Sequence, residues 1–333
     1  MNALIEAANV PRIQLARLPT PLVPLRRFSQ KHNIPTIWLK RDDLTDTAAS
    51  GNKLRKLEFT IAQALQQGAS TLITIGGVQS NHCRATAIIA SQLGLKSHLV
   101  LRGRKTSPAD GNLLLDELVG ARITYVSTAE YADIDQIISE LMRAYREQGE
   151  VPYAIPIGAS DEIGLWGYIE ASRELQLDFE NANIEPGYVV SAAGSGGTAG
   201  GLILGHQLYA LNNEVYSFNV CDDEAYFIRK IGADFQSWRK RYEIPININN
   251  LKINIVDRYV GPGYGKAEPP VIECIKDLAR TEGVILDPVY TGKAFQGLMT
   301  ELGSGSFSTS NDIVFIHTGG IFGLFPQKDT FVS

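Results

Sequence analysis

The sequence predicts an open α/β fold, in which helices cover both faces of a mainly parallel sheet. Short apolar runs rich in β-branched residues alternate along the chain with longer amphipathic segments. Several short runs, such as 188–190 and 313–316, are continuously apolar, which is typical of strands buried on both faces. The 333 residues are enough for one large α/β domain or for two lobes, each with its own core.

Strands are expected where β-branched and aromatic residues cluster between turn residues. In chain order they are 37–40, 71–75, 97–101, 122–126, 188–191, 215–220 and 313–317. Helices are expected where apolar residues recur three and four positions apart. In chain order they are 53–67, 81–93, 111–118, 134–148, 164–175, 197–210, 269–281 and 292–301. The first of these has Leu54 and Leu57 on one face, and the second has Ser80 or Asn81 as a suitable N-cap.

Composition excludes several classes of partner. The net charge of -5 gives no basic footprint, so nucleic acid is not expected to bind. No apolar run approaches the roughly 20 residues that a membrane helix needs. Residues 1–11 contain Glu6 and no long apolar core, so we expect no secretory signal and no membrane attachment.

The cysteines and histidines argue against disulfides and metal. Cys83, Cys221 and Cys274 are odd in number and form no CxxC pair, which fits a reducing, cytoplasmic compartment. The five histidines are scattered, and His82 and His206 have no neighbouring ligand pattern. We therefore expect no metal.

A lysine-containing motif opens the helix predicted from residue 53. Gly51-Asn52 is a turn pair, and Lys53, Arg55 and Lys56 follow it within one helical turn. Three cations beside the positive end of a helix dipole are mildly unfavourable, and a phosphate or carboxylate ligand would offset that cost. On the residues alone, a solvated helical turn with ordinary lysines explains the motif equally well.

A glycine-rich turn, Gly-Ser-Gly-Gly-Thr at 194–198, follows the apolar run at 188–191. Backbone N–H groups in such a turn can converge on an anion at a helix N-terminus. A tight turn that simply needs small residues is the alternative. No lysine follows in the P-loop position, and a dinucleotide site stays open because Asp222 and Asp223 lie at a suitable distance along the chain.

Other polar turns offer further candidates. Residues 79–82, Gln-Ser-Asn-His, could hold a substrate carboxylate or could only cap a helix. Tyr264, Tyr290 and Thr318 could line a pocket, or the tyrosines could be ordinary core aromatics. A lysine, a phosphate cradle and a polar loop in one chain suggest pyridoxal 5′-phosphate as a cofactor.

Taken together, the motifs resemble those of the fold-type II pyridoxal phosphate enzymes, and within them the D-cysteine desulfhydrase / 1-aminocyclopropane-1-carboxylate deaminase family. The segments that carry the resemblance are 18–22, 39–44, 51–58, 79–82, 194–198, 263–265, 286–293 and 317–320. The resemblance implies a tryptophan synthase β-like fold, with two open, twisted, mainly parallel sheets flanked by helices. It also implies a large cofactor-binding domain (1–54 and 167–333), an inserted small domain (55–166) and a homodimer.

The resemblance also implies residue roles. Lys53 would be the Schiff-base lysine, and Lys56 would hold the phosphate. The glycine turn would complete the phosphate site with Gly194, Ser195, Gly196, Gly197 and Thr198. Asn81 would contact the ring hydroxyl, and Ser80 would bind the substrate carboxylate or act as a catalytic hydroxyl. The remaining expected ligand contacts are Ser160 and His82 for the substrate, Tyr264 and Tyr290 beside substrate and ring, and Thr291 and Thr318 at the pyridine nitrogen.

Two positions separate the activities within the family. Relatives that open the cyclopropane ring carry Glu in place of Thr291 and Leu in place of Thr318. A carboxylate beside the pyridine nitrogen keeps it protonated and makes the ring a stronger electron sink. A thiol, with a pKa of about 8.5, is a tolerable leaving group and needs a weaker sink. The two threonines therefore favour loss of sulfide.

The chain also departs from the family pattern. Ala159 and Asp161 replace smaller or uncharged residues, which adds a methyl and a charge near the substrate end of the cleft. Cys221-Asp222-Asp223 replaces small hydroxyl residues and is more similar to plant members.

We therefore predict a cytoplasmic pyridoxal phosphate lyase that converts D-cysteine to pyruvate, ammonia and hydrogen sulfide. The acid/base group is Lys53, Tyr290 or Ser80. Alternatives are deamination of 1-aminocyclopropane-1-carboxylate to 2-oxobutyrate and ammonia, and β-elimination from another β-substituted amino acid. A catalytically silent ligand-binding homologue and an unrelated α/β binding protein are the alternatives of another class.

Overall fold

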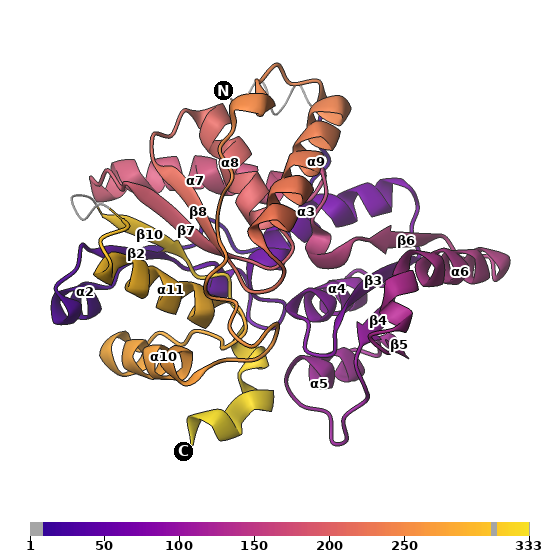
Figure 1. The fold of residues 1–333 in the computed structure, drawn as a ribbon. Helices are drawn as coiled ribbons and strands as arrows, with labels where there is room; N and C mark the ends of the chain where they lie inside the picture. Colours follow the sequence, from indigo (N-terminus) through magenta and orange to yellow (C-terminus); the bar gives the residue numbers. More distant parts are fainter. Residues whose placement is uncertain (1–8, 308–311, 333) are drawn as a thin grey trace.

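The computed structural model describes residues 9–307 and 312–332, which form two sheets flanked by helices (Figure 1). The larger sheet has the strand order β1-β2-β10-β7-β8-β9. Its strands are β1 (Leu22–Pro24), β2 (Ile37–Lys40), β7 (Tyr188–Ala193), β8 (Glu214–Asn219), β9 (Asn254–Val256) and β10 (Ile313–Ile316). Only β1 runs antiparallel to its neighbour among the described pairs.

The smaller sheet is parallel throughout and has the order β5-β4-β3-β6. Its strands are β3 (Thr71–Gly77), β4 (Lys96–Arg102), β5 (Arg122–Val126) and β6 (Pro152–Ile155). Helices α3 (Asn52–Gln66), α4 (Asn81–Gln92), α5 (Gly111–Leu118) and α6 (Ile134–Glu147) surround it in Figure 1. Buried aliphatic residues of α3 and α4 pack on Leu72 and Ile155 of this sheet.

Two apolar cores cover the faces of the larger sheet. One is built with α7 (Trp166–Ala182), α8 (Gly197–Tyr209) and α9 (Glu224–Tyr242). The other is built with α2 (Arg26–His32), α10 (Pro269–Glu282) and α11 (Thr291–Gly303). Because both faces are covered, the central strands consist almost entirely of buried residues, as in the IVFI sequence of β10.

The predicted α/β class and its two mainly parallel sheets are confirmed, and every predicted strand and helix is present. Three short strands, β1, β6 and β9, were not predicted, because three or four residues carry too little pattern. Helices α2 and α9 were also missed. In α9 the buried residues Phe227, Ile231, Phe235 and Trp238 recur at helical spacing, so the sequence contained the signal.

The predicted domain boundaries fall at particular places in this architecture. Residue 54 lies in the first turn of α3, and residue 167 is the second residue of α7. Helix α3 contacts both α4 beside the smaller sheet and α7 beside the larger one. The division into 1–54 with 167–333 and 55–166 stays a prediction.

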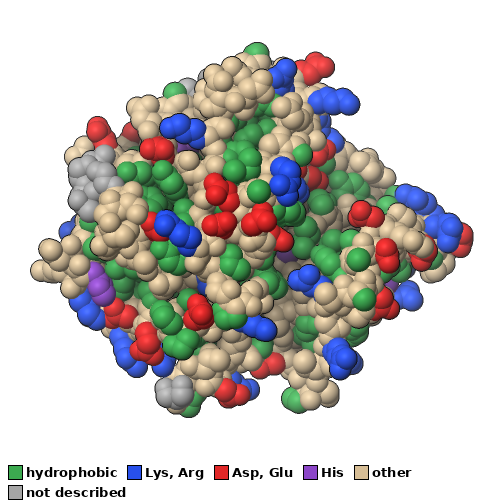
Figure 2. Space-filling model, viewed as in Figure 1, with side chains coloured by type: hydrophobic (Ala, Val, Ile, Leu, Met, Phe, Trp, Pro, Cys, Tyr) green, Lys and Arg blue, Asp and Glu red, His purple; other side chains and the backbone are tan. Residues whose placement is uncertain are grey.

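Charges on the face drawn in Figure 2 are mixed, with Lys and Arg side chains scattered among Asp and Glu side chains. No helix in the described part of the chain is long and apolar enough to cross a membrane.

Candidate active site

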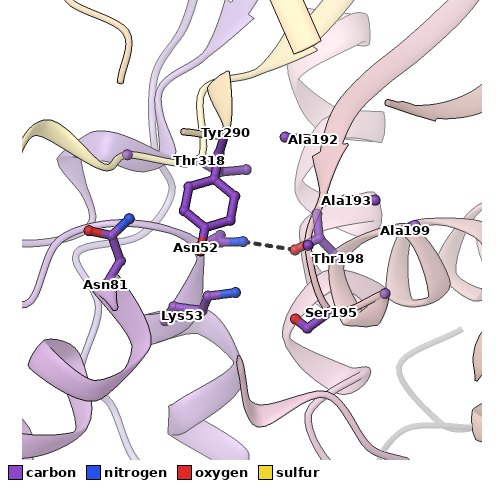
Figure 3. Close-up of a pocket in the computed structure, with 13 residues that line it drawn as sticks. Asn52, Lys53, Asn81, Ala192, Ala193, Ser195, Thr198, Ala199, Tyr290 and Thr318 are labelled. Atoms are coloured by element: carbon purple, nitrogen blue, oxygen red, sulfur yellow. Dashed lines mark hydrogen bonds between the residues drawn. The ribbon is translucent and has the colours of Figure 1, made fainter. Parts of the chain in front are cut away.

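Lys53 lies in the first turn of α3, directly beside the end of β10. Gly51, which precedes the helix, has φ 109°, a conformation that favours glycine. A Cβ at Gly51 would lie 2.7 Å from the backbone oxygen of Thr318, and the N–H of Asn52 donates to that oxygen at 3.1 Å. Glycine therefore lets α3 begin against the segment that follows β10, and this contact aims Lys53 into a cavity (Figure 3).

The lysine cavity, as we call it, is a space of about 410 Å³, part of it open solvent, between the start of α3 and the turn that joins β7 to α8. Its lining residues are Asn52, Lys53, Asn81, Ala192, Ala193, Gly194, Ser195, Gly196, Thr198, Ala199, Tyr290, Thr318 and Gly319. Most of the residues expected to contact the cofactor are among them, although they come from five separate parts of the chain.

A second, larger cavity, about 1280 Å³ when the open solvent at its mouth is included, adjoins the first, and we call it the outer cavity. It shares Lys53, Gly194, Ser195 and Tyr290 with the lysine cavity. Its other lining residues are Gly76, Gly77, Ser80, His82, Arg102, Tyr131, Ile157, Gly158, Cys221, Asp222, Tyr226, Val260, Gly263 and Tyr264. Both cavities thus lie where the carboxyl ends of strands from the two sheets meet, the usual ligand position in α/β folds.

Lys53 and Lys56 place two amines close together in the interior. Burial lowers the pKa of Lys53 to about 8. Burial and then the charge of Lys53 lower the pKa of Lys56 well below its usual value. Neither amine forms an ion pair with a carboxylate in the described part of the chain. A bound anion would therefore stabilise their charged forms.

Hydrogen-bond donors converge on the glycine turn from several elements. Lys56 Nζ donates to Ser160 Oγ at 3.0 Å, and the N–H of Gly197 donates to the same oxygen at 3.2 Å. Ser160 Oγ also pairs with Ser195 Oγ at 2.8 Å. Because Gly197 is the first residue of α8, the helix dipole favours an anion here.

Two residues that the sequence analysis did not single out complete this cluster. Asn52 Nδ2 donates to Thr198 Oγ1 at 3.0 Å, which joins the lysine helix to the glycine turn (Figure 3). Lys230 Nζ donates to the backbone oxygen of Ser160 at 3.0 Å and pairs with Asp234. Lys230 was missed because its helix, α9, was missed, whereas Asn52 could have been found from its place beside Lys53.

The 80–82 segment contributes its side chains to both cavities. Ser80 caps α4 by accepting from the N–H of Cys83 at 3.2 Å, and it lines the outer cavity. Asn81 lines the lysine cavity. His82 Nε2 pairs with Thr74 Oγ1 at 2.8 Å, and burial, followed by the charges of the two lysines, holds its pKa well below the usual value. Neutral His82 thus lies at the floor of the outer cavity.

Tyr264 and Tyr290 form a pair between the loop before α10 and the start of α11. Their hydroxyls are hydrogen-bonded to each other, and their rings meet edge to face with centroids 5.8 Å apart. Burial raises the pKa of Tyr264 to about 12, and burial and the neighbouring tyrosine raise that of Tyr290 well above its usual value. Both hydroxyls are therefore protonated and can donate.

The two threonines expected at the pyridine nitrogen have different surroundings. Thr318 lines the lysine cavity. Thr291 is fully buried and lines neither cavity. Its hydroxyl donates to Asp287 Oδ1 at 2.7 Å and accepts from the N–H of Asp287 at 2.9 Å. The geometry thus gives Thr291 a clear role in holding the turn before α11, and of the two threonines only Thr318 lines the lysine cavity.

The departures from the family pattern also have definite positions. Ala159 is buried and has φ 47°. Asp161 Oδ1 accepts from the N–H groups of Ile163 and Gly164 at 3.2 and 2.8 Å. Asp161 therefore fixes the turn before α7, and neither it nor Ala159 lines the lysine cavity or the outer cavity, although the neighbouring Gly158 lines the outer one. Their effect on the substrate stays a prediction.

The acidic pair after β8 is also divided between two roles. Asp223 accepts from the N–H of Tyr226 at 2.7 Å and caps α9, while Asp222 lines the outer cavity. Cys221 lies beside them, and burial raises the pKa of its thiol to about 12. Capping accounts for Asp223 without a ribose, which removes much of the support for a dinucleotide site.

Comparison with known proteins agrees with this geometry. The family model for pyridoxal-phosphate dependent enzymes matches residues 13–319. The bifunctional D-cysteine desulfhydrase/1-aminocyclopropane-1-carboxylate deaminase, mitochondrial, of Arabidopsis thaliana is 40% identical over 335 residues, covering 96% of this chain and 80% of the relative. A putative 1-aminocyclopropane-1-carboxylate deaminase of Thermotoga maritima is 43% identical over 321 residues, covering 95% of this chain and 98% of the relative.

Solved structures show the same fold. A crystal structure described as an ACC deaminase homologue superposes with a TM-score of 0.91 at 33% identity, and the match covers 100% of this chain and 99% of that one. An L-serine ammonia-lyase from Rhizomucor miehei superposes with a TM-score of 0.65 at 16% identity, covering 90% and 93%. The second likeness concerns the fold alone.

Proposed function

Because this chain belongs to the family of pyridoxal-phosphate dependent enzymes, we propose that it is a lyase that eliminates sulfide from D-cysteine. One molecule of D-cysteine and one of water would give pyruvate, ammonia and hydrogen sulfide. The single observation that carries the choice of substrate is the lack of any acidic residue among the described residues that line the lysine cavity.

The residues present fit the cofactor. Lys53 supplies a buried amine without a carboxylate partner, and the glycines leave space beside it. A Cβ at Gly158 would lie 2.3 Å from Ser195 Oγ and 3.2 Å from Lys53 Nζ. Lys53 would hold the cofactor covalently, and Lys56, Ser195 and the first N–H groups of α8 would hold its phosphate. When bound, the cofactor supplies an electron sink for negative charge at the substrate α-carbon.

Proton transfer is assigned from the surroundings of each group. With its pKa lowered to about 8 by burial, Lys53 is partly neutral near pH 7 to 8 and can accept a proton. Tyr290, whose pKa is well above its usual value, stays protonated, so its hydroxyl can donate a hydrogen bond and does not act as the base. We therefore propose Lys53 as the base that takes the α-proton and Tyr290, supported by Tyr264, as a hydrogen-bond donor that stabilises the departing thiolate.

The segment at the start of α4 would hold the substrate carboxylate. Ser80 lines the outer cavity, and the N–H groups at the start of α4 favour an anion. His82 would close the floor of this site, and Ser160 would act behind it through Ser195. Ser80 is thus proposed as a binding group and not as the base.

The lining of the lysine cavity, which has no carboxylate among the described residues, favours elimination over ring opening. A nearby carboxylate would keep the pyridine nitrogen protonated, and the hydroxyl of Thr318 cannot do so. The carboxylate of Asp287, on the turn before α11, accepts hydrogen bonds from Thr291 and from the N–H groups of Val289 and Tyr290. A substrate with a good leaving group at the β-carbon needs less electron withdrawal, which D-cysteine satisfies and the cyclopropane does not.

The assay that tests the proposal compares three substrates on the same preparation. We expect pyruvate and sulfide in equal amounts from D-cysteine, with a kcat/KM at least about tenfold higher than that for L-cysteine or for 1-aminocyclopropane-1-carboxylate. Formation of 2-oxobutyrate from the cyclopropane, faster than pyruvate from D-cysteine, would establish the alternative activity that both curated relatives carry in their names. A silent binding homologue would hold the cofactor and turn over none of the three.

A separate prediction concerns the phosphate end of the site. In Gly197→Ala the new Cβ would lie 2.6 Å from Ser160 Oγ and 3.1 Å from Lys56 Nζ, inside the proposed phosphate cradle. We expect the dissociation constant of pyridoxal phosphate from the apoprotein to rise about 10- to 100-fold, since overpacking of this kind costs about 1–3 kcal/mol. Gly232→Ala in α9, where a Cβ has open space, is the matched control. Equal affinity of both variants for pyridoxal phosphate would show that the phosphate does not bind beside Gly197.

Two further properties remain proposals. The described cysteines are unpaired, which supports a reducing, cytoplasmic location. A homodimer rests on the family resemblance.

A further inference from the structure

Arg84 is a buried cation on α4 that none of the roles above uses. We propose that it is a positioning residue, which fixes the amide of Asn81 so that its N–H₂ group faces the lysine cavity. The proposal relies on the proposed function only for the identity of the bound cofactor, since it concerns cofactor binding and not turnover.

The hydrogen bond to Asn81 determines how the amide is oriented. Arg84 NH1 donates to Asn81 Oδ1 at 3.1 Å. A guanidinium can only donate, so it must face the amide oxygen, and the nitrogen then lies on the other side. Figure 3 shows this arrangement, with Nδ2 of Asn81 on the side of Tyr290 and Oδ1 directed away from the cavity. The cavity therefore receives a donor at a fixed position.

The same guanidinium is held at both ends, which makes the arrangement rigid. Arg84 NH1 also donates to Asn112 Oδ1 at 2.7 Å, and Arg84 NH2 donates to the backbone oxygen of Ser50 at 2.7 Å. Ser50 lies three residues before Lys53 in the chain. The fork thus ties the loop that leads to Lys53 to the helix that carries Asn81, so that two segments which line one cavity share a single anchor.

The anchor is itself supported from α5 and from the segment after β10. Asn112 Nδ2 donates to the backbone oxygen of Gln79 at 3.0 Å, and the ring of Phe322 lies 4.7 Å from the Arg84 guanidinium carbon. All three acceptors of Arg84 are neutral oxygens, and in the described part of the chain its guanidinium forms no ion pair with a carboxylate. An arginine that serves only to balance charge would not need three neutral acceptors in this geometry.

A donor held in place before binding is worth more than a free one, because no rotamer entropy is lost when the ligand arrives. The oxygen of the hydroxyl group on the pyridoxal phosphate ring is the acceptor that fits the N–H₂ donor of Asn81. Lysine at position 84 would keep the charge but could not span the three acceptors, since it lacks the planar fork. The amide of Asn81 would then be free to rotate.

The test measures the dissociation constants of two ligands from the apoprotein of the Arg84→Lys variant and of the parent protein. These are pyridoxal phosphate and its analogue that lacks the ring hydroxyl, 3-deoxypyridoxal phosphate. We expect the dissociation constant of pyridoxal phosphate to rise about tenfold and that of the analogue to change less than twofold. Equal weakening of both ligands would show a merely structural role for Arg84, and no weakening of either would show no role; both results overturn the proposal.

Control variants separate positioning from folding. Arg122→Lys is matched, because Arg122 also lies over an aromatic ring, that of Tyr145, and does not line either cavity. It should bind both ligands like the parent protein. Asn81→Asp, which keeps an oxygen for Arg84 but loses the donor, should show the same ligand-selective loss as Arg84→Lys. If Arg84→Lys shows no cooperative thermal transition, Asn112→Ala loosens the same anchor, and we expect a selective loss of about threefold; an unselective loss there would overturn the proposal.

Discussion

Replacing Lys53 by alanine is expected to lower kcat by at least about 10³-fold and to leave pyridoxal phosphate unattached to the protein. The reason is that one amine performs two tasks, covalent attachment and proton transfer, and each such task typically contributes orders of magnitude in rate. Reduction with borohydride followed by mass measurement of the intact chain gives a readout that does not depend on turnover. The parent protein should retain the mass of the reduced cofactor, and Lys53→Ala should not.

The neighbouring lysine provides the control for this experiment. Lys56 is also buried and lies one helical turn further along α3, but its amine is bound to Ser160 at the glycine turn. Lys56→Ala should weaken cofactor binding and yet retain the cofactor after reduction, because Lys53 is still present. If Lys53→Ala retained the mass of the reduced cofactor, or if Lys56→Ala lost it at saturating cofactor, then Lys56 and not Lys53 would be the lysine that attaches the cofactor. Small amines added to Lys53→Ala should restore part of the proton transfer.

The sequence was sufficient to predict those parts of the site that are local along the chain. Lys53 follows a turn pair at a helix start, and the glycine turn follows a strand, so each was visible in a short window. The convergence of the two could be expected as well, because ligands in α/β folds lie beyond the carboxyl ends of parallel strands. The fold class could also be predicted from short windows of sequence, since continuous apolar runs indicate strands covered on both faces.

What could not be predicted depends on contacts between distant segments. Lys230 reaches Ser160 across 70 residues, and Arg84 reaches Asn112 across 28. Neither pair has a local signature. The role of Thr291 at the pyridine nitrogen came from the family resemblance and stays a prediction, and the sequence did not show that its hydroxyl donates to Asp287 four residues earlier. A side chain's direction within a turn is determined by such hydrogen bonds and is not readable from residue type.

Replacing Arg55 by methionine is expected to lower the free energy of unfolding by about 3–5 kcal/mol, the largest effect on stability that we expect from one change. Arg55 is buried two residues after Lys53 and binds both oxygens of buried Asp42, at 2.9 and 2.7 Å. It also donates to both oxygens of Glu174, at 2.9 and 3.0 Å. Methionine fills similar volume but leaves the carboxylate of Asp42 buried without its cation. Denaturant unfolding measures the change, and Arg173→Met, on the surface of α7, should stay within about 0.5 kcal/mol of the parent protein.

Acid unfolding checks the same network independently. Burial alone would raise the pKa of Glu174, but hydrogen bonds and charge from Arg55, together with Lys40, outweigh it and lower the pKa from 4.5 to about 2. A carboxyl whose pKa is lower in the folded state than in the unfolded chain stabilises the protein at any pH above its unfolded-state pKa. This stabilisation is lost as the pH falls from about 5 toward 2. In Arg55→Met most of the difference between the folded-state and unfolded-state pKa of Glu174 disappears. The variant should therefore be less stable at pH 7 and yet lose less further stability on acidification. A parallel loss in both proteins between pH 5 and 2 would mean that Arg55 does not hold Glu174 in its charged form. Because the network joins α3 to the larger sheet through Lys40 and Asp42, such a result would also remove the physical basis for a fixed position of Lys53.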